Sequence, residues 1–264
     1  MCGLAGIGMC ERQRNKTEID RIRRLFTRLL VESEHRGPYA TGVAVIGADG
    51  TCRVHKAPVM ASGFVSTHGY RDAMASVNSG TTIIMGHTRW PTRGSHLDNR
   101  NNQPLSGRCV VAHNGHIRNA DEVSDLLGLS RLWEVDSEAL LRIADRNLVN
   151  NGLDVSGLRD DLRYLSGRLS AVIADPRNPD TIYLIKGNQP LFLRWYQTLG
   201  ILVYASEEEI IDRAMNGTVP SRDIPIPAWT VVTLKLEQEP ELSFEPFAIK
   251  GGDDHGADYR HRDR

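Results

Sequence analysis

The sequence predicts an α+β protein in which two largely antiparallel sheets carry helices on their outer sides. Short apolar segments of strand-like composition outnumber the amphipathic helical stretches along the 264 residues. Most of these segments are joined by short turns, and such turns connect antiparallel neighbours. The chain is also long enough to bury a sizeable core. Periodicity alone does not fix how the layers stack, so the order of sheets and helices stays open.

The first half of the chain is predicted to contain one long helix among several strands. Residues 2–9 are apolar and glycine-rich, which indicates a buried strand. A helix is expected to begin with Thr17 as its cap and to end near Glu34. Its apolar side chains recur at helical spacing: Ile19, Ile22, Leu25, Phe26, Leu29 and Leu30. Further strands are expected over 41–47, 51–56, 81–87 and 109–113, the last ending abruptly at Asn114-Gly115.

Strands dominate the second half of the chain. Two helices come first, near residues 119–127 and 137–150, and Asp136 stands where an N-cap or first-turn acid is expected. A third helix is expected over 207–215. Predicted strands cover 170–175, 181–186, 191–196, 201–205 and 230–236. We expect one domain over residues 2–250 and a polar, flexible tail over 251–264.

Composition and charge exclude several classes of function. The chain is 40% hydrophobic and 25% charged, as in ordinary globular proteins, and its net charge is −1. So small a charge creates no field that would favour nucleic acid or an anionic membrane, and we expect neither as a partner. No apolar run reaches the ~20 residues of a membrane span. Because Arg12 and Arg14 follow the apolar start, the reverse of the secretory order, we expect no signal peptide and a cytoplasmic protein.

The chain has four cysteines: Cys2, Cys10, Cys52 and Cys109. They form no C-x-x-C pair, and a reducing compartment disfavours disulfides. We therefore expect no metal site and no cofactor. The last three cysteines are interpreted as small buried hydrophobes.

Cys2 could have a different role because it follows the initiator methionine. Removal of Met1 would leave the thiol of Cys2 beside its own α-amine. The reference pKa of such an amine is about 7.7–8.0 and that of the thiol about 8.5, so the two are matched for proton transfer. The amine could act as general base for the thiol, directly or through one water. On position alone, a buried structural cysteine is the commoner alternative.

Three further segments carry side chains suited to chemistry. Arg89 and Trp90 follow a predicted strand, where a guanidinium could hold a carboxylate and an indole could cover a ligand. Asn114 and Gly115 could point an amide and a backbone N–H at one oxygen, as in an oxyanion hole. Asp136 could hold an ammonium group. Each segment also has a structural alternative: a surface loop, an Asn-Gly turn and a helix cap.

Six motifs follow one another along the chain: CGLAGIG from Cys2, HRGPYATG from His35, GHTRWPTRG from Gly86, NNQPL from Asn101, VVAHNGHIRN from Val110 and VDSEAL from Val135. Together, in this order, they resemble the class II glutamine amidotransferase family, and most closely the glutaminase domain of glucosamine-6-phosphate synthase. The resemblance covers roughly residues 2–240. The departures are Tyr39 in place of an aspartate, Pro91 in place of a small residue and Arg93 in place of a histidine.

The resemblance implies the four-layer αββα sandwich of N-terminal-nucleophile hydrolases. It also implies an enzyme that hydrolyses the γ-amide of glutamine through a thioester on Cys2, with Asn114 and Gly115 as the oxyanion hole. Arg89 would bind the α-carboxylate of glutamine and Asp136 its α-ammonium. Trp90 and Thr92 would line or close the pocket, and Arg36 belongs to a loop near the nucleophile.

Family members usually join this domain to a synthase that consumes the ammonia. No such segment follows in this sequence, so we expect a separate ammonia-accepting synthase subunit. Three alternatives stay open. The first is a γ-glutamyl hydrolase with another γ-glutamyl substrate, the second a non-catalytic glutamine-sensing module, and the third a metal-binding or structural domain, which the lack of ligand spacing disfavours.

Overall fold

The computed structural model describes residues 1–150, 152–217 and 219–251. Of the tail predicted over 251–264, residues 252–264 lie outside this description. No helix in the described part of the chain is long and apolar enough to cross a membrane.

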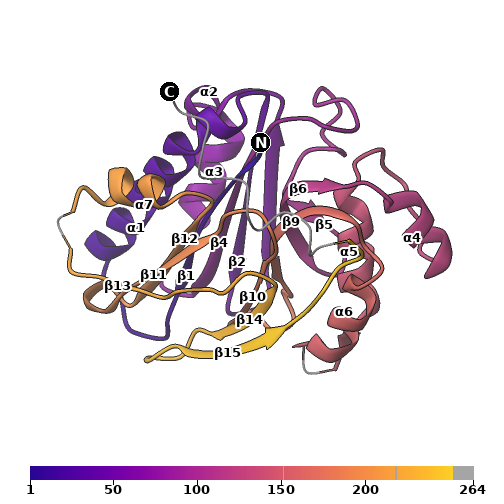
Figure 1. Cartoon of the computed structure of the whole chain (residues 1–264). Helices are drawn as coiled ribbons and strands as arrows, with labels where there is room; N and C mark the ends of the chain where they lie inside the picture. Colours follow the sequence, from indigo (N-terminus) through magenta and orange to yellow (C-terminus); the bar gives the residue numbers. More distant parts are fainter. Residues whose placement is uncertain (151, 218, 252–264) are drawn as a thin grey trace, which may run out of the picture.

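The first sheet contains the strand that follows Cys2. Its seven strands run in the order β13-β11-β12-β1-β4-β2-β3, and every pair of neighbours is antiparallel. The central strand β1 lies between β12 and β4, so the start of the chain is held on both sides (Figure 1). The strands are β1 (Gly3–Met9), β2 (Ala40–Gly47), β3 (Cys52–Ala57), β4 (Thr81–Arg89), β11 (Phe192–Tyr196), β12 (Ile201–Ala205) and β13 (Arg222–Asp223).

The second sheet has six strands in the order β15-β14-β10-β9-β6-β5, again antiparallel throughout. A separate small hairpin pairs β7 (Leu148–Val149) with β8 (Gly152–Leu153). The strands of the sheet are β5 (Leu105–Ser106), β6 (Val110–Ile117), β9 (Gly167–Ala174), β10 (Thr181–Lys186), β14 (Thr230–Lys235) and β15 (Glu241–Pro246).

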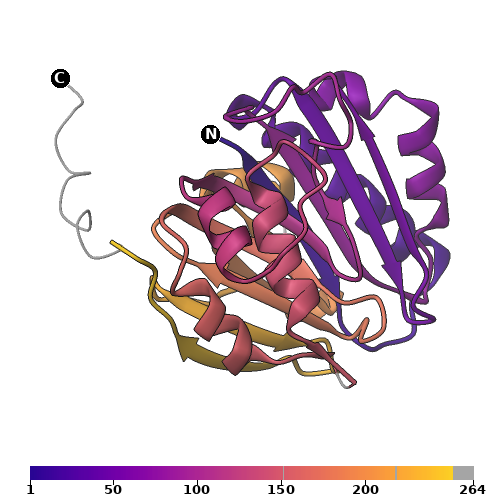
Figure 2. The same ribbon diagram turned by 90° about the vertical axis from the view of Figure 1, so that its right-hand side faces the viewer.

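Helices cover the outer faces of both sheets, which gives the predicted αββα layering (Figures 1 and 2). The first sheet carries α1 (Lys16–Glu32), α2 (Ala61–Phe64), α3 (His68–Ser76) and α7 (Glu208–Met215). The second sheet carries α4 (Ala120–Leu126), α5 (Ser137–Arg146) and α6 (Val155–Leu162). Two 3₁₀ turns, η1 (Glu34–Arg36) and η2 (Gln197–Leu199), complete the elements.

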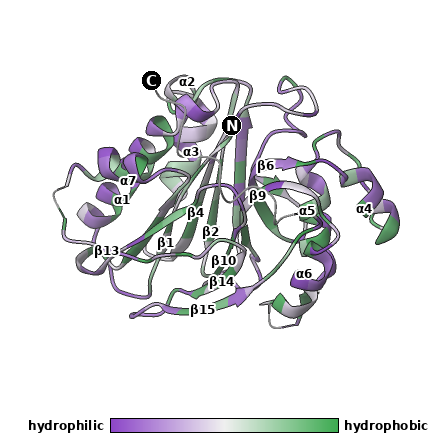
Figure 3. Cartoon of the chain, in the orientation of Figure 1, coloured by the Kyte–Doolittle hydropathy of each residue, from purple (hydrophilic) through white to green (hydrophobic). Residues whose placement is uncertain are grey.

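Three apolar cores correspond to the three interfaces between these layers. The core between the sheets joins Leu4 and Met85 of the first sheet to Val172 and Leu184 of the second. Figure 3 shows the apolar residues concentrated along the strands between the helix layers. The predicted apolar face of α1 packs on the first sheet, with its six side chains buried: Ile19, Ile22, Leu25, Phe26, Leu29 and Leu30.

Several predicted boundaries are wrong. The cap of α1 is Asn15, not Thr17, because the Asn15 side chain accepts from the N–H of Glu18 and the Glu18 carboxylate accepts from that of Asn15. Asp136 holds the N-cap position of α5 but makes no capping hydrogen bond. The same helix ends at Arg146 rather than near residue 150.

Strand β6 does not end at Asn114-Gly115, as the turn-like dipeptide had predicted. It continues to Ile117, because Asn114 pairs with Ser170 and Gly115 with Leu169 in the neighbouring strand β9. Short helices α2, α3 and α6 and strand β15 were not predicted. Cys10 and Cys109 are buried as expected, whereas Cys52 is only half-buried.

Candidate active site

Cys2 directly precedes β1 and is 7% exposed. Its sulfur faces the backbone of Trp90: the Trp90 N–H donates to Sγ at 3.4 Å, and Sγ lies 3.6 Å from the Trp90 carbonyl oxygen. Burial raises the pKa of the Cys2 thiol, and the Trp90 N–H, the N-terminal charge and Arg89 oppose that rise. The thiol is therefore held protonated and needs a base to become a nucleophile.

An amine lies close to this thiol. Met1 precedes Cys2 in the structure, and burial lowers the pKa of its α-ammonium. The charge of Cys2 works against that shift, whereas the nearby cations Arg36 and Arg168 reinforce it. These influences act on the amine of Met1; after removal of Met1 the free amine would belong to Cys2 itself, beside its own thiol.

Arg36 and Asn114 converge on the carbonyl oxygen of Cys2. Arg36 is 5% exposed and donates from Nε to that oxygen at 2.9 Å. Asn114 is fully buried in β6. In the orientation that satisfies both of its neighbours, its amide nitrogen donates to the Cys2 oxygen at 3.0 Å and its amide oxygen accepts from Arg36 Nη2 at 3.3 Å. The structure thus brings three predicted site residues together.

Close contacts with neighbouring backbone atoms require glycine at two positions of the predicted motifs. A Cβ on Gly115 would lie 1.9 Å from the carbonyl oxygen of Arg168, and Gly115 has φ +150°, which disfavours other residues. A Cβ on Gly37 would lie 2.5 Å from backbone atoms of Thr88 and Arg89. The second contact brings the Arg36 turn against the end of β4.

The guanidinium of Arg89 is turned toward its own loop. The side chain is buried, and Nη2 donates to the carbonyl oxygens of Arg93 at 2.7 Å and Gly94 at 2.9 Å. Nη1 donates to Asn102 Oδ1 at 2.8 Å and, more weakly, to the carbonyl oxygen of Ser95 at 3.4 Å. Arg89 therefore organises the loop that follows β4, in addition to any contact with a ligand.

The segment Asn101-Asn102-Gln103 forms a polar junction whose structural role the sequence did not predict. All three side chains are buried. Asn101 Oδ1 accepts from the N–H groups of Glu134 and Val135, Asn102 binds Arg89, and Gln103 Oε1 accepts from the N–H of His113 at 2.6 Å. The segment thus links the loop after β4, the approach to α5 and strand β6. Three consecutive amides beside a proline were the only signal in the sequence.

Asp136 is 2% exposed and points back toward β6. Its Oδ2 accepts from the N–H of Ile117 at 2.6 Å and lies 3.4 Å from Nδ1 of His116. Burial lowers the pKa of the Arg89 guanidinium, and the charges of Cys2 and Asp136 oppose that shift. The Asp136 charge also adds to the rise in the pKa of Cys2 that burial causes, so the three groups lie within electrostatic reach of one another. A buried carboxylate in this position is suited to a cationic ligand group.

The remaining predicted pocket residues are more open. The Trp90 side chain is 44% exposed and packs edge-on against Tyr39, with ring centroids 5.2 Å apart. Tyr39 makes a second edge contact with His96. Thr92 is exposed in the loop after β4, and a role in lining a pocket stays a prediction.

A pair of buried histidines ties the two sheets together beneath the site. His87 Nε2 lies 3.1 Å from the carbonyl oxygen of His113, so this nitrogen carries the hydrogen. Burial, with smaller effects from Arg89, His113 and Lys56, lowers the pKa of His87 to about 3. His113 Nε2 likewise faces a carbonyl oxygen, and the Ser137 hydroxyl therefore donates to Nδ1 at 2.8 Å. His87 thus donates one hydrogen bond to β6, while its buried Nδ1 has no hydrogen-bond partner among the described residues. His113 both donates and accepts.

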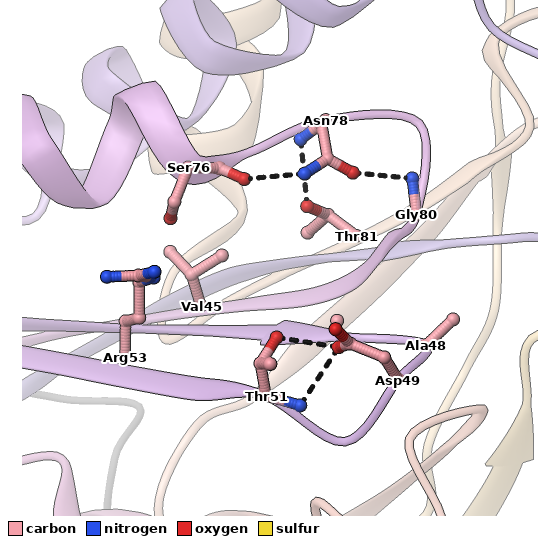
Figure 4. Close-up of a pocket in the computed structure, with 10 residues that line it drawn as sticks. Val45, Ala48, Asp49, Thr51, Arg53, Ser76, Asn78, Gly80 and Thr81 are labelled. Carbon is pink, nitrogen blue, oxygen red and sulfur yellow. Dashed lines mark hydrogen bonds between the residues drawn. The ribbon is translucent and has the colours of Figure 1, made fainter.

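A surface hollow of about 480 Å³ lies elsewhere, at the turn between β2 and β3 (Figure 4). Its polar groups are engaged locally: Asp49 binds Thr51, and the Asn78 side chain binds the N–H of Gly80. Strand β2 runs from beside Arg89 to this end, a distance of about 24 Å at 3.4 Å per residue. The hollow is therefore remote from Cys2.

Comparisons with known proteins found curated relatives and solved structures that are similar to this chain. No family model matches the chain. It is 27% identical over 227 residues to 7-cyano-7-deazaguanine synthase of Sulfolobus acidocaldarius, an alignment that covers 84% of this chain and 46% of the relative. It is 30% identical over 201 residues to glutamine–fructose-6-phosphate aminotransferase (isomerizing) of Bacillus licheniformis, covering 73% and 30%. The chain thus spans less than half the length of these curated relatives.

Among solved structures, the glutamine phosphoribosylpyrophosphate amidotransferase of B. subtilis, complexed with ADP and GMP, is similar with a TM-score of 0.70. The match covers 94% of this chain and 50% of that chain, at 19% sequence identity. At that identity the likeness shows a shared fold.

Proposed function

We propose that the chain belongs with the class II glutamine amidotransferases and that it hydrolyses the side-chain amide of glutamine to glutamate and ammonia. The nucleophile is the thiol of Cys2 after removal of Met1. The observation that supports this best is the convergence of the Asn114 amide and the Arg36 guanidinium on Cys2, whose sulfur is itself held by Trp90.

The proposed reaction begins with proton transfer from the Cys2 thiol to its own α-amine. The thiolate attacks the γ-carbonyl carbon of glutamine, and the resulting oxyanion accepts hydrogen bonds from the Asn114 side chain and the Gly115 N–H. The ammonium of Cys2 then returns the proton to the leaving nitrogen as the carbon–nitrogen bond breaks and ammonia departs. Water attacks the thioester in the same way, which releases glutamate and the thiol.

The charged end of glutamine is recognised by the pair Arg89 and Asp136 in this proposal. A carboxylate can compete for Arg89 most easily where the existing bond is weakest, at the 3.4 Å contact with Ser95. The buried carboxylate of Asp136 suits the α-ammonium. Trp90 and Thr92 lie in the adjoining loop and would cover the bound substrate.

Cys2→Ala tests the reaction directly. Ammonia release from glutamine should disappear, whereas Cys52→Ala, which removes a half-buried thiol on β3, should leave the rate unchanged. Mass spectrometry of the active protein should show that Met1 is absent. Activity that survives in Cys2→Ala, or full activity with Met1 retained, contradicts the mechanism. A panel of γ-glutamyl peptides separates a glutaminase from a γ-glutamyl hydrolase.

The ammonia is proposed to pass to a separate synthase subunit. The relatives are named as a synthase and an aminotransferase, and this chain matches 46% and 30% of their lengths. An ammonia-consuming partner should copurify with the chain and stimulate glutamine hydrolysis. If glutamine is hydrolysed equally fast with and without each copurified protein, the result counts against a partner.

A further inference from the structure

Glu207 lies next to the candidate active site without belonging to any of the predicted motifs. It follows β12, the neighbour of β1, and is the N-cap residue of α7. One carboxylate oxygen forms an ion pair with Nη1 of Arg36, and the other lies 2.7 Å from Nε2 of His35. His35 Nδ1 faces the carbonyl oxygen of Glu32 at 2.8 Å, so both ring nitrogens face acceptors.

Arg36 uses its guanidinium in three directions. Nε donates to the Cys2 carbonyl oxygen, Nη1 to Glu207, and Nη2 to the side-chain oxygen of Asn114 at 3.3 Å. Because a guanidinium only donates, it allows one orientation of the Asn114 amide, with the oxygen toward Arg36 and the NH₂ toward Cys2. That orientation is the one in which Asn114 can donate to an oxyanion.

Glu207 restricts the orientation of the Arg36 guanidinium through their ion pair. The Arg36 side chain is 4% exposed, so a guanidinium without a counter-ion would be costly there. Burial alone would raise the pKa of Glu207, but hydrogen bonds from His35 and Arg36 outweigh it and keep the pKa below its usual value. The carboxylate is therefore available as a charged anchor at neutral pH.

We propose that Glu207 is a positioning residue for the oxyanion hole, which it orients through Arg36 and the amide of Asn114. This inference rests on the proposed glutaminase function. It assigns to Glu207 no contact with substrate. Its effect should appear in the step that forms the tetrahedral oxyanion, and not in the binding of the charged end of glutamine at Arg89 and Asp136.

Glu207→Gln is the first test, because it removes the charge and keeps the size. Loss of one oxyanion donor costs about 10²–10³-fold in rate, so misorientation of Asn114 should lower kcat about 10–100-fold with KM changed less than about threefold. Glu207→Asp, which keeps the charge, should recover part of the loss. The matched control is Glu208→Gln: Glu208 is the next residue but pairs with Arg194 at 2.8 Å, and its loss should leave kcat unchanged.

Alkylation of Cys2 by iodoacetamide separates positioning from general damage. Displacement of iodide forms no oxyanion, so the rate at Cys2, followed by peptide mass, should stay within about twofold in Glu207→Gln while kcat falls. Parallel loss of alkylation and turnover would mean that Glu207 only maintains the local structure, and the proposal would be overturned. If Glu207→Gln does not fold, the same two rates measured on Glu207→Asp decide the question.

A double-mutant cycle tests the route through Arg36. In an Arg36→Met background, Glu207→Gln should lower kcat by less than about twofold further, because its effect passes through the missing guanidinium. Additive losses would contradict that route. A wild-type protein without glutaminase activity would refute the proposed function itself, whereas an active wild type with an equally active Glu207→Gln variant would refute only the role of Glu207.

Discussion

Inside the protein, Oδ1 of Asn102 accepts a hydrogen bond from Nη1 of Arg89 at 2.8 Å. The bond joins the end of β4 to a segment 13 residues later in the chain. Nη2 of Arg89 also donates to the carbonyl oxygens of Arg93 and Gly94. Together these bonds hold the intervening loop against the end of β4. The loop next to Cys2 is therefore held in shape by the side chain of one arginine.

Arg89→Lys should loosen this loop. A lysine ammonium cannot reproduce the planar fork that serves four acceptors, so KM for glutamine should rise about tenfold and amide exchange over residues 90–102 should accelerate. Arg93→Lys is the matched control, since Arg93 forms a surface ion pair with Asp121. Hydrogen exchange and steady-state kinetics on the three proteins measure both effects. An unchanged exchange rate in Arg89→Lys would show that the backbone alone holds the loop.

Asn114→Ala should lower kcat for glutamine about 10²–10³-fold, because one donor to the oxyanion is lost. KM should change little, since Asn114 does not contact the charged end of the substrate in the proposed pose. Asn78→Ala serves as control, because Asn78 is exposed at the remote end of the first sheet. A dominant effect on KM would place Asn114 in substrate binding and outside the oxyanion hole.

Gly115→Ala should destabilise the protein and inactivate it. The new Cβ would meet the Arg168 carbonyl oxygen at 1.9 Å and would stand at a φ of +150°. Strain of this kind costs about 1–3 kcal/mol before any displacement of β6 is counted. Gly63→Ala, where a Cβ in α2 meets nothing within 4 Å, should be neutral or slightly stabilising. Urea titration of both variants makes the comparison.

His87 should make the protein sensitive to acid. Its folded-state pKa is about 3, below the unfolded value of about 6.5, so the unfolded chain binds the extra proton first. The stability contributed by neutral His87 is present above pH 6.5 and is lost as the pH falls toward 3. His87→Gln keeps a side-chain N–H and removes the titration, so its melting temperature should fall less between pH 7 and pH 4.

The control for this pH dependence is His68→Gln. His68 has an 87% exposed side chain on α3, and its removal should leave the slope of melting temperature against pH unchanged. His113 is also buried with a lowered pKa, so part of the acid sensitivity should survive in His87→Gln. Identical slopes in wild type and His87→Gln would show that another group controls acid unfolding.

Local sequence patterns predicted the elements that consist of a continuous apolar run or carry a clear helical repeat. Strands β10 and β12 begin and end where their apolar runs do, and the buried face of α1 follows its helical repeat. The short helices α2 and α6 were missed because four to eight residues hold too little periodicity to stand out. The end of β6 was misplaced because pairing with β9 outweighs the turn preference of Asn-Gly.

The site could be predicted in part. Cys2, Arg36 and Asn114 were singled out by residue type and motif order, and the structure places them in contact. The inward turn of Arg89 and the anchor Glu207 could not be foreseen, because their partners come from loops whose paths only the tertiary structure fixes. A side chain's type says what it can bind, whereas its neighbours decide what it does bind.

The position of β1 determines when the first sheet can be completed during synthesis. Its two flanking strands are β4 and β12, the second of which ends at residue 205. During synthesis, β1 can pair with β4 once residue 89 has emerged, but its other edge stays open until β12 is complete at residue 205. A shorter nascent chain therefore presents an unpaired strand edge beside its amino end, which is a hazard for aggregation on the ribosome.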